Sequence, residues 1–137
     1  MMPQSVSKDE GSLSEFSTQR ALKKLAFIAK EPHYVGSENH KIVADFLVQE
    51  LENLGLEPLI QEGYSLTDWG NLVKSKNIVA RIKGTSNSKA LLLLSHYDSA
   101  PHSKSLGASD DGSGIITILE GLRTYLKAIM SPDLIIK

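Results

Sequence analysis

Residues 90–98 read Ala90-Leu91-Leu92-Leu93-Leu94-Ser95-His96-Tyr97-Asp98. The apolar residues that open this stretch have no polar alternates, and such a run is typical of a β-strand that helices cover on both faces in an α/β sheet. His96 and Asp98 follow at the carboxyl end of the predicted strand, which is the edge where open α/β sheets build their sites. The stretch therefore predicts both a fold class and the place of a functional site.

Helical patterns lie on both sides of this strand. Apolar residues recur at helical spacing over 17–30 and 37–54 before it and over 115–129 after it, which predicts three helices. The serines that begin the first two ranges are of the type that caps helix N-termini. Gly55 is suited to the left-handed conformation that ends a helix, so we expect the second helix to stop there.

Extended segments complete the pattern. Residues 56–64 and 76–83 are expected to be strands, and the apolar run at 134–136 begins another. We therefore expect an α/β fold, a three-layer α/β/α sandwich with a mixed, mostly parallel central sheet, present in part with about three to four strands and three helices. Residues 1–15 are polar and are expected to be a linker or stalk, and 16–137 the amino-terminal part of one domain.

The composition of the chain excludes several kinds of binding and catalytic site. The chain has 137 residues, with 15 Lys and Arg against 16 Asp and Glu, a formal net charge of −1, which provides no field to attract nucleic acid. It has no cysteine, so thiolate nucleophiles and cysteine zinc sites are excluded and any metal must bind His and carboxylate ligands. No apolar run approaches the roughly 18 residues of a spanning helix, and the start lacks the pattern of a signal peptide.

A second polar cluster follows the first. Residues 107–114 read Gly107-Ala108-Ser109-Asp110-Asp111-Gly112-Ser113-Gly114, with two adjacent carboxylates just before a predicted helix. Helix capping needs only one acceptor, whereas an Asp with two free oxygens could bridge two metal ions about 3.5–4 Å apart. Taken separately, His96 and Asp98 also fit a hydrogen-bonded loop histidine, and Asp110 and Asp111 also fit a helix cap.

Other readings of this cluster fit poorly. A calcium loop needs a Glu about six residues after its Gly, where this chain is apolar. Ser113 lacks the preceding strand and the spacing of a serine-hydrolase elbow. Asp110 and Asp111 would repel a phosphate. His33 and His102 are expected to be solvated loop residues.

The two clusters in combination resemble the co-catalytic zinc aminopeptidases of metallopeptidase family twenty-eight. That family's pattern is an apolar strand, His-x-Asp, a short loop, and Gly-Ala-x-Asp-Asp-x-Ser-Gly leading into an apolar helix, as at 91–98 and 107–114 here. The lead-in segments at 16–22 and 32–37 also look similar, so the resemblance covers roughly 16–137. The family's peptidases are the expected class for this chain.

The resemblance implies a role for each site residue. His96 would be a ligand of one zinc, and Asp110 would bridge the two zinc ions of a complete site. Asp98 would be the catalytic residue that orients His96 through the other ring nitrogen, and Asp111 a supporting residue joined to Asp110 by a cis peptide bond. The cofactor implied is zinc, with two ions per complete site.

The family also needs a Glu-Glu pair after the next strand, and later an Asp and a His, none of which matches a position in this sequence. Glu120 cannot act as the general base, because it lies some two helical turns, roughly 10 Å, beyond the start of the third helix. The chain is therefore expected to be the amino-terminal part of the peptidase domain. On its own it should bind zinc weakly and catalyse nothing.

The activity that the resemblance implies is metal-assisted removal of amino-terminal residues from peptides with a free amino terminus. The sequence looks most similar to members that lie outside the cytosol beside membrane-spanning helices, so the complete protein is expected to be extracytoplasmic and membrane-associated. Two alternatives stay open. One is a one-zinc, glutaminyl cyclase-like acyltransferase, and the other is a catalytically dead binding domain of the same fold.

Overall fold

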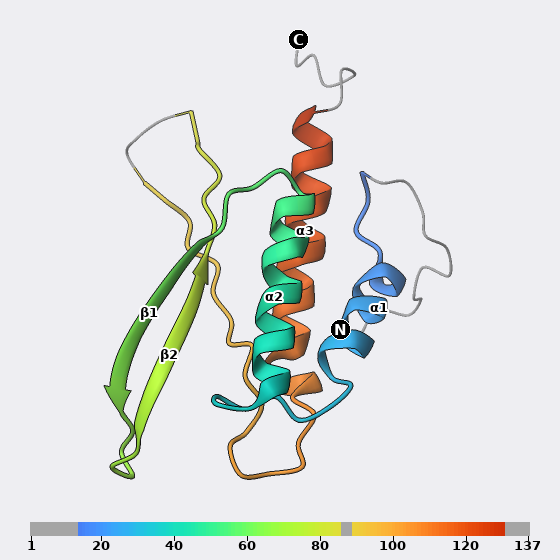
Figure 1. Cartoon of the computed structure of the whole chain (residues 1–137). Coiled ribbons are helices and arrows are strands. Elements are labelled where there is room, and N and C mark those ends of the chain that lie inside the picture. Colours follow the sequence, from blue (N-terminus) through green and yellow to red (C-terminus); the bar gives the residue numbers. More distant parts are fainter. Residues whose placement is uncertain (1–13, 86–88, 131–137) are drawn as a thin grey trace.

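The computed structural model describes residues 14–85 and 89–130 (Figure 1). Its elements follow in the order α1 (Thr18–Ile28), α2 (Glu38–Asn53), β1 (Leu59–Leu66), β2 (Leu72–Val79), the short π-helical turn η1 (Ala108–Gly112) and α3 (Ser113–Met130). Figure 1 shows the β1–β2 hairpin on one side of the helices α2 and α3, and α1 on the other. The three predicted helices are confirmed.

Local capping explains where the first two helices begin and end. The Ser17 hydroxyl accepts from the Arg20 backbone N–H at 3.3 Å, and the Ser37 hydroxyl accepts from the His40 N–H at 3.2 Å. Each bond satisfies an N–H that has no partner within the helix. Gly55 follows α2 with φ +79°, the left-handed conformation that a side chain disfavours. The capping predictions are therefore confirmed.

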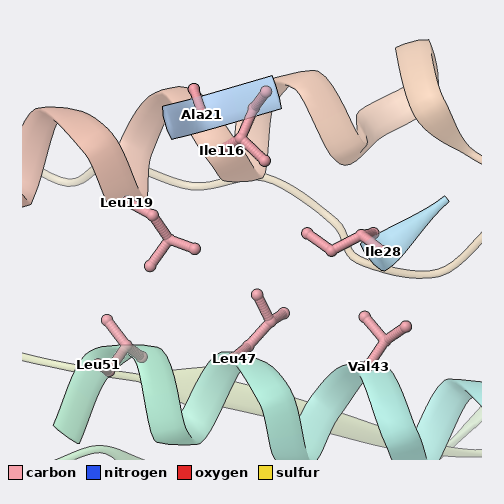
Figure 2. Close-up of a cluster of buried hydrophobic side chains, with 7 residues drawn as sticks. All are labelled: Ala21, Ile28, Val43, Leu47, Leu51, Ile116 and Leu119. Atoms are coloured by element: carbon pink, nitrogen blue, oxygen red, sulfur yellow. The ribbon is translucent and has the colours of Figure 1, made fainter. Parts of the chain in front are cut away.

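The apolar core lies between the three helices. Figure 2 shows side chains of α2 pointing toward those of α1 and α3. On α2 the core residues recur every four positions, so they form one stripe along the helix. Burying a side chain of this size stabilises the fold by roughly 1.5–3 kcal/mol. The buried cluster consists of Ala21, Ile28, Val43, Leu47, Leu51, Ile116 and Leu119.

The two predicted extended segments form an antiparallel hairpin. Its register runs from Leu59 opposite Val79 to Leu66 opposite Leu72. The connecting turn is closed by the N–H of Gly70, which donates to the Thr67 carbonyl at 2.9 Å. Both strands thus exist, with the first shifted a few residues later and the second a few residues earlier than the sequence indicated.

The predicted central strand is wrong for the structure as described. Residues 89–107 contain no helix or strand, and the run at 91–94 is exposed, with Leu91 at 85% and Leu94 at 77% of full accessibility. A strand requires a neighbour with which to form hydrogen bonds, and within the described residues β1 and β2 pair only with each other. The further strand predicted at 134–136 lies outside the described residues.

The start of the described chain is attached to the helices. The Glu15 carbonyl accepts from Arg20 Nη2 at 2.7 Å and from Arg123 Nη2 at 2.6 Å. Residues 1–13 of the predicted linker lie outside the described residues. Within the described ranges, no helix combines the length and the apolar character needed to cross a bilayer.

Candidate metal centre

The two polar clusters meet at one end of the molecule, where residues 95–99 pass beside η1 and the first turn of α3. His96 Nε2 lies 3.0 Å from Asp110 Oδ1, although the two residues are 14 positions apart. Their side chains are 51% and 84% exposed. An imidazole nitrogen and a carboxylate oxygen therefore face each other where a solvated ion has access to both.

The second ring nitrogen of His96 has a backbone acceptor. Nδ1 lies 3.1 Å from the Asp98 carbonyl oxygen, and 3.5 Å from the Asp98 carboxylate oxygen Oδ1. A carbonyl can only accept, so this contact is a hydrogen bond when Nδ1 carries the proton, which is the neutral tautomer whose Nε2 lone pair could bind a metal ion. The orienting group is thus on Asp98, with its main chain nearer than its carboxylate.

The surroundings also set the charge of His96. Burial acts to lower its pKa, but the hydrogen bonds to Asp110 and to the Asp98 carbonyl, with the negative charges of both residues, raise the pKa overall. The imidazolium is the form in which both ring nitrogens donate. A metal ion at Nε2 would have to displace that proton, so metal binding at this site would release it.

Asp110 and Asp111 have different partners. Asp111 Oδ1 accepts from the Gly114 N–H at 3.1 Å, which caps α3, and Asp111 Oδ2 accepts from the Ser95 hydroxyl at 2.5 Å. Asp110, joined to Asp111 by the expected cis peptide bond, has its carboxylate directed to His96. One acid therefore caps the helix while the other is presented to the site.

The two histidines that the sequence predicts to be solvated differ in their exposure. His33 was expected to be solvated, but it is 1% exposed. Its ring packs beneath the site loop, so that a Cβ on Gly107 would lie 3.1 Å from it. Its main-chain N–H donates to the Ser99 hydroxyl at 2.9 Å. His102 is exposed, as expected.

Glu120 belongs to a buried ion-pair network and not to the site. Its side chain is fully buried, and Oε1 accepts from the Ser17 N–H at 2.9 Å, Arg20 Nε at 3.1 Å and Arg123 Nη2 at 2.7 Å. Burial acts to raise the pKa of Glu120, but these hydrogen bonds and the two guanidinium charges lower it overall. The carboxylate is committed to joining α1 and α3, which agrees with its exclusion as a general base.

The donor set fits zinc in part. Neutral imidazole and carboxylate are common zinc ligands, and His96 with Asp110 supplies one of each. Across residues 14–85 and 89–130, no group of three or more His, Asp or Glu side chains is arranged to hold a metal ion. Beside the pair lies an open groove of about 520 Å³, with residues 92–94 on one wall and Thr117 and Ile118 of α3 on the other.

Three further residues of the site loop make contacts that the sequence does not predict. Ser95, Tyr97 and Ser99 hold the site loop through bonds to Asp111, to β2 and to His33. Hydroxyl residues are common in loops, so their presence here does not by itself indicate a role at the site. Their alternation with His96 and Asp98 is the one pattern that could have indicated them.

The chain is similar to known proteins in both sequence and structure. Residues 77–136 match the model of peptidase family M28. A vacuolar membrane protease of Candida albicans is 35% identical over 102 residues, covering 70% of this chain. A zinc-dependent exopeptidase from Parabacteroides distasonis superposes with a TM-score of 0.72 at 29% identity over 85% of this chain. A glutaminyl cyclase from Macrostomum lignano superposes with a TM-score of 0.72 at 25% identity over 94% of it.

The chain corresponds to only part of the length of each of these proteins. The chain spans 12% of the Candida protease, 44% of the exopeptidase chain and 41% of the cyclase chain. The structural likeness confirms the α/β fold. The match to the family model includes both polar clusters, and these matches together show that the chain belongs to peptidase family M28.

Proposed function

We propose that this chain provides the amino-terminal part of a zinc-dependent aminopeptidase and carries half of its metal centre. The observation that carries the proposal is the approach of His96 Nε2 to Asp110 Oδ1 at 3.0 Å. The family match over residues 77–136 and the likeness to a zinc-dependent exopeptidase support it.

Each residue has a defined part in this proposal. His96 would bind zinc through Nε2 while the Asp98 carbonyl holds the Nδ1 proton, with Asp98 as the orienting catalytic residue. Asp110 would be the carboxylate ligand shared by the two zinc ions of a complete site. Asp111 supports Asp110 by capping α3 and bonding Ser95. Bound zinc would act as a Lewis acid that polarises the carbonyl of the scissile peptide bond.

The proposed substrates are peptides with a free amino terminus, and nucleic acid is not a partner. We propose that the general base and the remaining ligands come from additional polypeptide, since the described residues offer only two ligands. The small share of each relative that this chain spans is consistent with that arrangement. The 137-residue chain alone is then inactive.

A membrane-associated, extracytoplasmic setting is proposed for the complete protein. Several fungal relatives are named vacuolar membrane proteases, among them one from Schizosaccharomyces pombe that is 29% identical and covers 90% of this chain. Within the described residues themselves, no helix is long and apolar enough to span a bilayer.

A second candidate is a glutaminyl cyclase-like acyltransferase. The superposition with the Macrostomum cyclase over 94% of this chain favours keeping it. The two reactions are distinguished by their products: an aminopeptidase releases a free amino acid, whereas cyclisation of an amino-terminal glutamine releases ammonia.

The test is a product assay on a complete zinc-loaded enzyme containing this chain. Leucine-amide and glutaminyl peptides are supplied in parallel, with His96→Ala and Asp110→Asn variants as controls. Release of leucine that both variants abolish supports the aminopeptidase. Cyclisation without leucine release supports the second candidate, and a complete protein that binds no zinc and catalyses neither reaction contradicts both.

A further inference from the structure

The site loop has alternating contacts. Ser95 bonds the Asp111 carboxylate at 2.5 Å, Tyr97 donates to the Lys76 carbonyl at 3.0 Å, and Ser99 accepts from the His33 N–H at 2.9 Å. Successive side chains of an extended segment point to opposite sides. The odd-numbered residues are bonded to other parts of the fold. Between them, His96 Nε2 faces Asp110, and Asp98 lies beside His96 Nδ1.

Tyr97 is the central member of this series. Its ring stacks on the ring of His40, with centroids 4.8 Å apart and planes 17° from parallel. His40 lies in the first turn of α2, and its backbone N–H is bound by the capping hydroxyl of Ser37. The phenol oxygen reaches the main chain of β2. Tyr97 thus joins the loop to a helix and a strand at once.

We propose that Tyr97 is a positioning residue of the metal centre, which holds the backbone between His96 and Asp98 so that His96 Nε2 faces Asp110. The proposal rests on the metal site proposed above and adds the residue that sets its geometry. Tyr97 has covalent neighbours on both sides that belong to the site. A displacement of its ring would therefore move the imidazole and the carbonyl that orients it together.

A purely structural tyrosine would behave differently. Its loss would reduce the stability of the fold but leave the metal affinity of the remaining folded molecules unchanged. Loss of a group that orients a metal ligand typically weakens metal affinity by about 10–100-fold. Zinc affinity, measured on folded protein, therefore separates the two roles.

The experiment is a zinc titration of the 137-residue chain followed by ¹H–¹⁵N NMR, which detects binding up to millimolar concentrations and shows which residues respond. Tyr97→Leu and His40→Ala remove the stack, Tyr97→Phe removes only the hydroxyl, and His40→Phe restores an aromatic partner. Phe27→Leu is the matched control, because Phe27 forms a second aromatic pair with Phe46 at 4.4 Å.

We expect wild-type zinc binding to shift the His96 resonances. Tyr97→Leu and His40→Ala should weaken binding at least tenfold, Tyr97→Phe less so, and His40→Phe should recover most of the affinity. If all variants bind zinc as the Phe27→Leu control does, Tyr97 is a packing residue and the proposal is overturned. If the wild-type chain shows no His96 response to zinc, the metal site itself is contradicted and the positioning role falls with it.

Discussion

At the residue scale, the first turn of α3 separates two acids that are adjacent in the chain. Asp111 is fixed by the Gly114 N–H and the Ser95 hydroxyl, while Asp110 faces His96. This division depends on the absence of a side chain at Gly114. A Cβ there would overlap the Asp111 carboxylate and lie 2.6 Å from Ser95 Oγ.

Gly114→Ala is therefore predicted to destabilise the fold. The added methyl group must displace the capping carboxylate, and overpacking of this kind typically costs about 1–3 kcal/mol. Gly121→Ala in the same helix is the matched control, since nothing lies within 4 Å of its Cβ position and alanine favours a helix by roughly 0.5–1 kcal/mol. Urea unfolding measures both. Equal stability of the two variants would show that Gly114 is not a site of close contact.

Some features of the site could be predicted from the sequence and others could not. His96 and Asp110 could be predicted because each lies in a short pattern with a recognisable spacing. The burial of His33 could not, since it depends on Ser99 and Gly107, some 70 residues away along the chain. His96 Nδ1 lies nearer to the Asp98 carbonyl than to the Asp98 carboxylate, and no sequence pattern indicates which of these two oxygens is closer.

At the element scale, the packing of α1 on α3 includes a charged network. Glu120 accepts from Arg20, Arg123 and the Ser17 N–H while fully buried. A buried carboxylate with these partners is stabilising only while all of them are present. The network also places the start of α1 against the middle of α3.

Glu120→Gln is predicted to lower the free energy of unfolding by about 3–5 kcal/mol at neutral pH, as expected when one partner of a buried ion pair is lost. The exposed Glu52→Gln, on α2, should change it by less than about 0.5 kcal/mol. Chemical denaturation of both variants beside the wild type provides the measurement. A small and equal loss for the two would contradict the burial of the network.

The same carboxylate predicts a pH dependence. Because the pKa of Glu120 is lowered in the folded chain, its stabilisation is fully present above its unfolded pKa of about 4.3 and is lost as the pH falls through the folded-state value. The stability difference between wild type and Glu120→Gln should therefore shrink in acid. Denaturation series from pH 7 to pH 3 test this, and a difference that grows in acid would reverse the assigned sign.

The helices could be predicted from sequence more completely than the strands. Caps at Ser17 and Ser37 and the four-residue spacing on α2 act within a few residues, so local patterns report them. The apolar run at 91–94 has the composition of a buried strand, but strand formation depends on partners that are distant in the chain. Composition alone therefore indicated a strand that the described residues do not form.

Core packing between the helices gives a further prediction. Leu47 is 5% exposed at the centre of the α2 stripe, whereas Ile42 on the same helix is 48% exposed. Leu47→Ala should destabilise the fold by about 2–5 kcal/mol through lost burial and a cavity, and Ile42→Ala by much less. Comparable losses in thermal or urea unfolding would mean that the two helix faces have been assigned wrongly.

At the scale of the whole molecule, a run of exposed apolar residues lies beside the candidate metal centre. The four leucines at 91–94 are 54–85% exposed, and Leu92, Leu93 and Leu94 line the groove against α3. Contiguous exposed apolar surface of this kind promotes association. We therefore expect the 137-residue chain to self-associate in solution.

Sedimentation equilibrium tests this expectation. The wild-type mass should rise with concentration above 15.0 kDa, and Leu91→Ser with Leu92→Ser should return it toward the monomer value. Tyr125→Ser, which removes an exposed aromatic ring on α3 (53%), is the matched control and should leave association unchanged. A wild-type chain that stays monomeric at all concentrations contradicts this prediction.

The central claim is that His96 and Asp110 form one half of a zinc centre. X-ray absorption of the zinc-loaded 137-residue chain tests it most directly, with His96→Ala and Asp110→Asn measured alongside. We predict a zinc–nitrogen shell at about 2.0–2.1 Å that His96→Ala removes, and an oxygen contribution at about 2.0–2.2 Å that Asp110→Asn reduces. A zinc spectrum that neither substitution changes would place the ion elsewhere and contradict the account.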